Sequence, residues 1–202
     1  FRLLPLLALL AVSCGPADQR TGDPAAALDE YFRSAVPAGE PGAAVLVMSG
    51  DTLLFSGGYG LADLRDSVPV TTSTLFNLGS ISKTFVSNAI LQLRDSGRLS
   101  LQDPVGKYFP AFKNKDIARA VTVAHLLTHT SGLPDNRFPY QDSVFYLTAK
   151  DQENWAPIMR ADKLVFEPGS RFEYSNPAFN GLALIIEQVS GRKWQTFIQE
   201  GI

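Results

Sequence analysis

Apolar residues in the first third of the chain form two short runs separated by a turn. The first run covers Ala43–Met48, and the second begins with Thr52–Phe55 and ends in Gly57-Gly58. Ser49-Gly50-Asp51 between them is typical of a turn, so the pattern predicts a β-hairpin. Because the first run is nearly continuous and does not alternate, we expect these strands to belong to a sheet that helices cover.

Apolar residues spaced at helical steps predict three helices further along the chain. The strongest pattern runs over Ile81–Leu93 and is closed by Ser96-Gly97, as at a helix C-terminus. A buried helix is expected to start at Pro177 and to end at Gly191, and another is expected over Lys193–Glu200. The C-terminal part of the chain is therefore predicted to be mainly helical.

The segment between these patterns is less regular. Asp103–Phe112 contains prolines and aromatic residues and is expected to form a loop or short turns. Thr122 is expected to cap a short helix that holds His125-Leu126-Leu127. Over Asn136–Leu164 the periodicity is weak, so we expect irregular structure with one helix near Asp151–Ala161.

Composition narrows the class of protein without identifying it. The 202 residues are 45% hydrophobic and 10% aromatic, which is a globular composition and excludes a wholly disordered chain. The formal net charge is -2, and no window carries a sustained basic run. Nucleic acid is therefore not expected as a partner.

The N-terminal residues predict export. Leu3–Val12 is too short to span a bilayer but suits the apolar region of an export signal. Leu10–Cys14 resembles a bacterial lipobox, which would make Cys14 the lipidated N-terminus of a membrane-anchored lipoprotein; the alternative is a plain signal peptide and a periplasmic protein. Residues 1–14 are thus assigned to the signal, and 15–27, rich in Gly, Pro, Ala and Asp, to a flexible tether. Since Cys14 is the single cysteine, no internal disulfide and no Cys-based zinc site is expected.

Ser80 and Lys83 form the first candidate catalytic pair. Residues three apart on a helix lie on one face, so the hydroxyl and the amine are expected to meet. A serine needs a base to become nucleophilic, and a lysine can serve if burial and a helix N-terminus lower its pKa. The same helix end favours an oxyanion on Ser80, and Gly79 allows close backbone approach.

Ser-x-x-Lys spacing alone is a weak signal, because Ser190 and Lys193 share it. Gly191 ends that helix, however, so Ser190 is expected at the negative end, where an alkoxide would be repelled. A second sequence motif favours Ser80 over Ser190 as the nucleophile. Tyr174-Ser175-Asn176 contains the only Tyr-x-Asn in the chain and directly precedes the predicted buried helix.

These segments together resemble a known family. Phe-Asn-Leu-Gly-Ser-Ile-Ser-Lys-Thr-Phe at 76–85 is similar to the first motif of class C β-lactamases and related esterases, within the superfamily that includes the penicillin-binding proteins. His-Leu-Leu-Thr-His-Thr-Ser-Gly-Leu-Pro at 125–134 resembles the loop that follows. Glu167-Pro168-Gly169 and 172–176 resemble the approach to the second motif. The resemblance covers residues 41–202, and the joint occurrence in this order is specific.

The resemblance implies a fold and a set of roles. The fold is of the α/β (α+β) class, β-lactamase/transpeptidase-like, with an antiparallel sheet flanked by helices plus a mainly helical region, here assigned to 28–202. Ser80 would be the acylated nucleophile, Lys83 the proton acceptor, Tyr174 the general acid/base and Asn176 a substrate-binding donor. No cofactor and no metal is implied. His125 and His129 would be structural, in place of a Ser-His-Asp triad or a metal pair.

The implied activity is hydrolysis of an ester, amide or β-lactam through an acyl-enzyme, as in β-lactamases, D-alanyl carboxypeptidases and esterases. The alternative is a non-catalytic penicillin- or peptidoglycan-binding lipoprotein. The substrate is a small molecule or is derived from peptidoglycan, and the oligomeric state is open. The family's third motif and its second oxyanion-hole amide do not occur before Ile202. We therefore expect a sequence truncated at the C-terminus, without the last strands and inactive by itself.

Overall fold

The computed structural model describes residues 23–137 and 143–202 and divides the chain into two compact units, residues 1–77 and 78–202. The predicted signal and Cys14 lie outside the described residues, as does most of the predicted tether. Within the described ranges, every helix is too short or too polar to cross a membrane.

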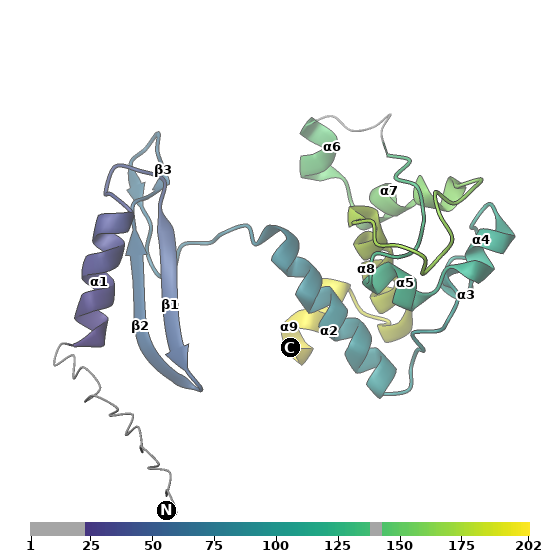
Figure 1. Ribbon diagram of the computed structural model, residues 1–202, viewed down its shortest axis with the longest axis horizontal. Coiled ribbons are helices and arrows are strands. Elements are labelled where there is room, and N and C mark those ends of the chain that lie inside the picture. Colours follow the sequence, from purple (N-terminus) through teal and green to yellow (C-terminus); the bar gives the residue numbers. More distant parts are fainter. Residues whose placement is uncertain (1–22, 138–142) are drawn as a thin grey trace, which may run out of the picture. The chain divides into compact units, whose positions relative to one another are not determined.

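The first unit begins with helix α1, Pro24–Ala35. The helix starts inside the segment 15–27 that the sequence assigned to the tether. Local capping explains this start: the Asp23 carboxylate accepts the Ala25 N–H at 3.0 Å, and Pro24 already has a helical φ. The helix runs alongside strand β2 in Figure 1, and its Phe32 ring lies 5.7 Å from the ring of Tyr59.

The predicted hairpin is confirmed. Strands β1, Ala43–Ser49, and β2, Thr52–Tyr59, pair antiparallel with Val47 opposite Phe55. Strand β2 includes the Gly57-Gly58 pair, where the sequence pattern ended it, and extends one residue further, to Tyr59. A Cβ at Gly58 would lie 2.5 Å from the carbonyl oxygen of Val70, so glycine there permits a close crossing by another segment.

The rest of the first unit is a second, shorter antiparallel ladder between β3, Leu61–Asp63, and β4, Val68–Pro69. Along β1 the half-buried Val45 and Val47 alternate with the exposed Leu46 and Met48. In this unit one face of the strand is therefore more buried than the other.

The three long predicted helices are confirmed in the second unit. Helix α2 covers Ser82–Asp95 after a 3-10 turn, η1, at Gly79–Ile81; α8 covers Asn176–Ser190 and α9 covers Trp194–Gly201. Gly191 ends α8 in the left-handed conformation that the sequence predicted. Helices α2 and α9 lie side by side in Figure 1, and the Gln92 side chain donates to the Gly201 carbonyl at 3.0 Å.

Shorter helices form the region for which the sequence pattern predicted mainly loops and irregular structure. They are α3, Val105–Tyr108; α4, Lys115–Ala120; α5, Val123–Leu127; α6, Ser143–Thr148; α7, Asp151–Trp155; and η3, Ile158–Arg160. The Thr122 cap of α5 is confirmed. The helix expected near Asp151–Ala161 is found in part, as α7 and then η3, whereas α6 was not expected. Elements of one or two turns are too short to show a period and depend on local caps such as Asn114 before α4.

The core of the second unit is built around α8. Nine of its residues are buried, and Leu182, Ile185 and Ile186 are fully enclosed. The Trp155 ring is also fully buried, and a Cβ at Gly181 would lie 2.9 Å from it. Each enclosed aliphatic side chain contributes about 1.5–3 kcal/mol of transfer free energy. The start of α8, where Asn176 lies, is therefore firmly anchored.

Candidate active site

Ser80 lies in the 3-10 turn that leads into α2, on an exposed surface. Gly79 before it has a φ of +53°, a conformation that glycine adopts without a steric penalty. The turn places the Ser80 hydroxyl at the N-terminal end of a helix of 14 residues, whose partial positive charge favours an oxyanion.

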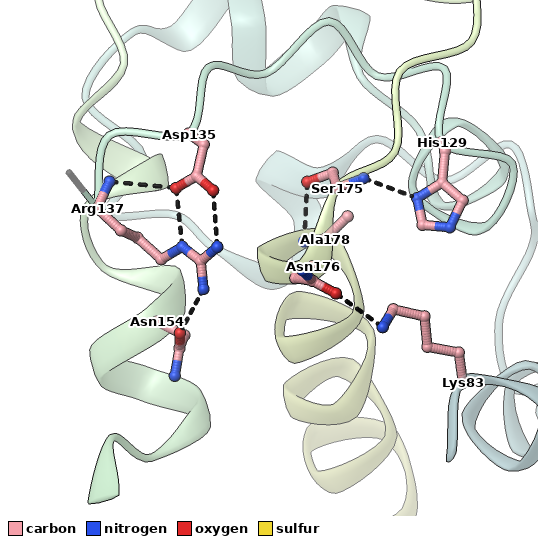
Figure 2. Close-up of polar contacts among 8 residues, drawn as sticks. All are labelled: Lys83, His129, Asp135, Arg137, Asn154, Ser175, Asn176 and Ala178. Atoms are coloured by element: carbon pink, nitrogen blue, oxygen red, sulfur yellow. Dashed lines mark hydrogen bonds and ion pairs between the residues drawn. The ribbon is translucent and has the colours of Figure 1, made fainter. Parts of the chain in front are cut away.

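Four predicted site residues come together in the second unit. The Lys83 Nζ donates to the Ser80 Oγ at 3.3 Å and to the Asn176 Oδ1 at 2.8 Å. The Tyr174 hydroxyl donates to the same Ser80 Oγ at 2.8 Å. Figure 2 shows Lys83 reaching from α2 to Asn176 at the start of α8. The Ser80 oxygen thus lies within hydrogen-bond distance of two groups that can exchange protons.

The charge on Lys83 governs the electrostatics of this cluster. A hydrogen bond from Lys83, then one with Ser80, and the lysine charge itself lower the pKa of the Tyr174 phenol, and partial burial opposes them less strongly. The Lys83 Nζ also lies 5.1 Å from the centroid of the Tyr174 ring and 5.7 Å from that of Phe179. The lysine side chain is half-buried against these rings. The arrangement favours a phenolate beside the hydroxyl of Ser80.

Main-chain hydrogen bonds bring Tyr174 to this place. The turn after α5 pairs with the segment before α8: Gly132 O accepts the Val165 N–H, Thr130 O accepts the Gly169 N–H, and His129 O accepts the Glu173 N–H, each at 2.8 Å. We call these three bonds the 129–173 ladder. They join two segments far apart in sequence, which is why spacing alone could not show the approach of Tyr174 to Ser80.

Both histidines bind backbone amides. The His125 Nδ1 accepts the Thr122 N–H at 3.2 Å and completes the cap of α5, while the His129 Nδ1 accepts the Ser175 N–H at 3.1 Å. Among the residues that the structure describes, no group of three or more His, Cys, Asp or Glu side chains is placed to hold a metal ion.

An ion pair formed by a buried arginine next to the ladder could not be predicted from the sequence. Arg137, only 5% exposed, donates to both oxygens of Asp135 at 2.8 and 2.7 Å and to the Asn154 Oδ1 at 2.8 Å (Figure 2). Burial raises the pKa of Asp135, but the hydrogen bonds and charge of Arg137 outweigh it, so the pKa is lowered. The group ties the chain after Pro134 to α7. Weak periodicity in this region offered no signal for it.

A pocket of about 250 Å³ adjoins Lys83 and Asn176 between α2 and α8. Asp151 lies in its wall, where one carboxylate oxygen accepts the Asn180 amide N–H at 2.8 Å and the other accepts the Trp194 indole N–H at 2.9 Å. Nothing in the sequence pattern singled out Asp151. The pocket gives the cluster a concave side.

Comparisons with known proteins add to this geometry. The family model described as Beta-lactamase matches residues 28–202. Protein flp of Staphylococcus aureus (strain COL) is 34% identical over 160 residues, which is 78% of this chain and 32% of that protein. The chain therefore spans about a third of the length of the curated relatives it matches.

Two solved structures are similar throughout most of the chain. The octameric penicillin-binding protein homologue from Pyrococcus abyssi is 29% identical, with a TM-score of 0.72 over 88% of this chain and 41% of that one. The D-stereospecific amidohydrolase from Streptomyces sp. is 29% identical, with a TM-score of 0.68 over 88% of this chain and 53% of that one.

Proposed function

This chain belongs to the β-lactamase family, and from that premise we propose that the whole protein is a serine hydrolase acting through an acyl-enzyme on Ser80. The observation that carries the proposal is the Ser80 Oγ, which lies 2.8 Å from the Tyr174 hydroxyl and 3.3 Å from the Lys83 Nζ. A hydroxyl so placed can lose its proton as it attacks a carbonyl carbon.

Each side chain then has a role that its contacts support. When the Lys83 ammonium passes its proton to the Tyr174 phenolate, it becomes a neutral amine, which accepts the proton of Ser80 as the new C–O bond forms. Tyr174, with its lowered pKa, returns a proton to the leaving group as the scissile bond breaks. The Asn176 Oδ1 is engaged by Lys83, which leaves its Nδ2 to donate to the substrate. Water then attacks the acyl ester and releases the acid and Ser80.

The bond cleaved is an ester, an amide or a β-lactam, in a small molecule or a peptidoglycan-derived substrate. The similarity to an amidohydrolase supports the amide as one of these. All three present a carbonyl carbon to Ser80 and differ in the group that departs, so the chemistry of the cluster is common to them.

Covalent labelling tests the nucleophile. Incubating the whole protein with a fluorophosphonate or with penicillin is expected to add one label at Ser80, measured by intact mass and peptide mapping, and the Ser80→Ala variant should take up none. A label that persists in Ser80→Ala, or a wild-type protein that neither reagent labels, would contradict the proposal. A penicillin adduct that never hydrolyses, without turnover of any ester or amide, would favour the non-catalytic binding protein instead.

We also propose that the protein is exported and anchored through lipidation of Cys14, on the strength of the Leu10–Cys14 motif alone. In a bacterial host, the wild-type protein should fractionate with membranes and carry the mass of a diacylglyceryl group on Cys14, and Cys14→Ala should be released or remain unprocessed. A Cys14→Ala protein that fractionates like the wild type would exclude the anchor.

A further inference from the structure

His129 lies at the turn where the chain after α5 meets the segment that carries Tyr174. Its backbone φ is +56°, a left-handed conformation that a residue with a Cβ adopts at a conformational cost. Histidine is among the residues that tolerate this region better than most. The turn directs both the carbonyl and the imidazole of His129 toward residues 173–175.

His129 accepts hydrogen bonds from the two residues that precede and follow Tyr174 in the chain. The His129 carbonyl accepts the Glu173 N–H at 2.8 Å, and the Nδ1 accepts the Ser175 N–H at 3.1 Å, the bond drawn in Figure 2. The imidazole also lies against the Tyr174 ring, with the ring centroids 4.4 Å apart and the planes tilted by 35°. His129 therefore fixes the peptide groups before and after Tyr174 and one face of its ring.

We propose that neutral His129 is a positioning residue, which holds Tyr174 against Ser80, and that protonation of its imidazole releases Tyr174. The inference rests on the proposed function only for the claim that Tyr174 takes part in catalysis. The geometric claim, that the imidazole holds the Ser175 amide, stands by itself.

The bond to Ser175 exists in one charge state only. The Nδ1 accepts through its lone pair, so the proton of the neutral ring is on Nε2. In the imidazolium, Nδ1 carries a proton, and two donors would face each other across 3.1 Å. Protonation therefore replaces an attraction with a repulsion at the peptide group next to Tyr174.

The surroundings of the imidazole disfavour its charged form. Phe172 and Phe179 pack around it, with ring centroids at 5.7 and 5.1 Å. The titratable groups that face it are Lys83, which is a cation, and Tyr174; the Glu173 carboxylate is paired with Arg171 at 2.8 Å. Burial and then the charge of Lys83 lower the pKa of His129. The proposed release of Tyr174 thus occurs at a pH below 6.5, the ordinary pKa of histidine.

Two substitutions of His129 test its role as a hydrogen-bond acceptor separately from the packing of its ring against Tyr174. His129→Phe keeps an aromatic face for Tyr174, but it leaves the Ser175 N–H without its acceptor and adopts the φ of +56° at a greater cost than histidine does. It is expected to lower kcat about tenfold with little change in KM. His129→Asn offers an amide oxygen, tolerates the left-handed conformation and does not titrate. It should recover most of the kcat lost in His129→Phe, and the acid-side fall of kcat due to His129 should be absent from its pH profile.

His125→Asn is the matched control. His125 lies four residues earlier, its Nδ1 also accepts a backbone N–H, and burial also lowers its pKa, but its partner is Thr122. This variant should keep the acid-side profile of the wild type. If His129→Asn also keeps that profile, or if His129→Phe matches the wild type, the positioning role is excluded.

A readout without turnover keeps this inference distinct from the proposed function. The Ser175 amide resonance should shift as the pH falls through the His129 pKa in the wild type and stay constant in His129→Asn. Constancy in both proteins would overturn the inference. Lack of Ser80-dependent hydrolysis, with the resonance titrating as expected, would overturn the proposed function and leave the His129–Ser175 switch intact.

Discussion

Ser80→Ala is expected to lower kcat of the whole protein by about 10⁴-fold or more, and Lys83→Met to cause a loss of at least about 10²-fold. The reason is that the hydroxyl and the amine, 3.3 Å apart, perform one step together. Groups that act as a unit are strongly non-additive, so the double variant should lose little more than Ser80→Ala alone. Steady-state hydrolysis of an activated ester measures all three.

The chain supplies its own control for this series. Ser190 and Lys193 repeat the Ser-x-x-Lys spacing, but Ser190 is the last residue of α8, at the negative end of the helix, and Lys193 is paired with Glu187. Ser190→Ala and Lys193→Met should leave kcat within about twofold of the wild type, because neither contacts the cluster around Ser80. A loss in this pair as large as that in Ser80 and Lys83 would contradict the assignment.

Gly132→Ala is expected to destabilise the second unit by about 2–5 kcal/mol. The backbone φ of Gly132 is +67°, which costs an alanine about 1–2 kcal/mol. The new Cβ would also lie 2.0 Å from the carbonyl oxygen of Phe166, and relieving a packing clash costs about 1–3 kcal/mol more. Chemical denaturation monitored by circular dichroism measures the change, and the displaced ladder should lower activity as well.

Gly191→Ala isolates the backbone part of that effect. Its φ is +72°, and nothing lies within 4 Å of where the Cβ would be, so only the conformational cost of about 1–2 kcal/mol remains. An equal loss of stability in the two variants would show that the close approach of Phe166 to Gly132 is not important for the fold.

Elements with strong local signals could be predicted from the sequence. The limits of α2 and α8 follow from helical periodicity and from terminal residues such as Gly191, and the Thr122 cap follows from its own side chain. Features that depend on contacts distant in sequence were not predicted. The close approach of the Val70 carbonyl to Gly58 is one of them, because nothing near Gly58 in the sequence indicates it.

The candidate site also combines residues that local spacing predicts with residues that depend on contacts distant in sequence. Ser80 and Lys83 meet because they are three positions apart on helical backbone, which is less than one turn, and this spacing predicts their contact. Tyr174 and Asn176 could be linked to them only through the family resemblance, since the bonds that bring them together join segments far apart. His129 was expected to be structural, but its bond to Ser175 was not predicted, and the contributions of Arg137 and Asp151 were missed. Each of these depends on a partner in another element.

The 129–173 ladder has a consequence for how such a protein diversifies. Its three hydrogen bonds join peptide groups only. Most side chains of residues 165–173 can therefore be substituted during evolution without changing the backbone register that positions Tyr174. Two glycines are exceptions: Gly132 on the facing segment, where the Phe166 carbonyl leaves no room for a side chain, and Gly169 within residues 165–173, whose φ is +83°. Homologous proteins can therefore differ in the side chains of this segment beside Ser80 while they keep the same catalytic geometry.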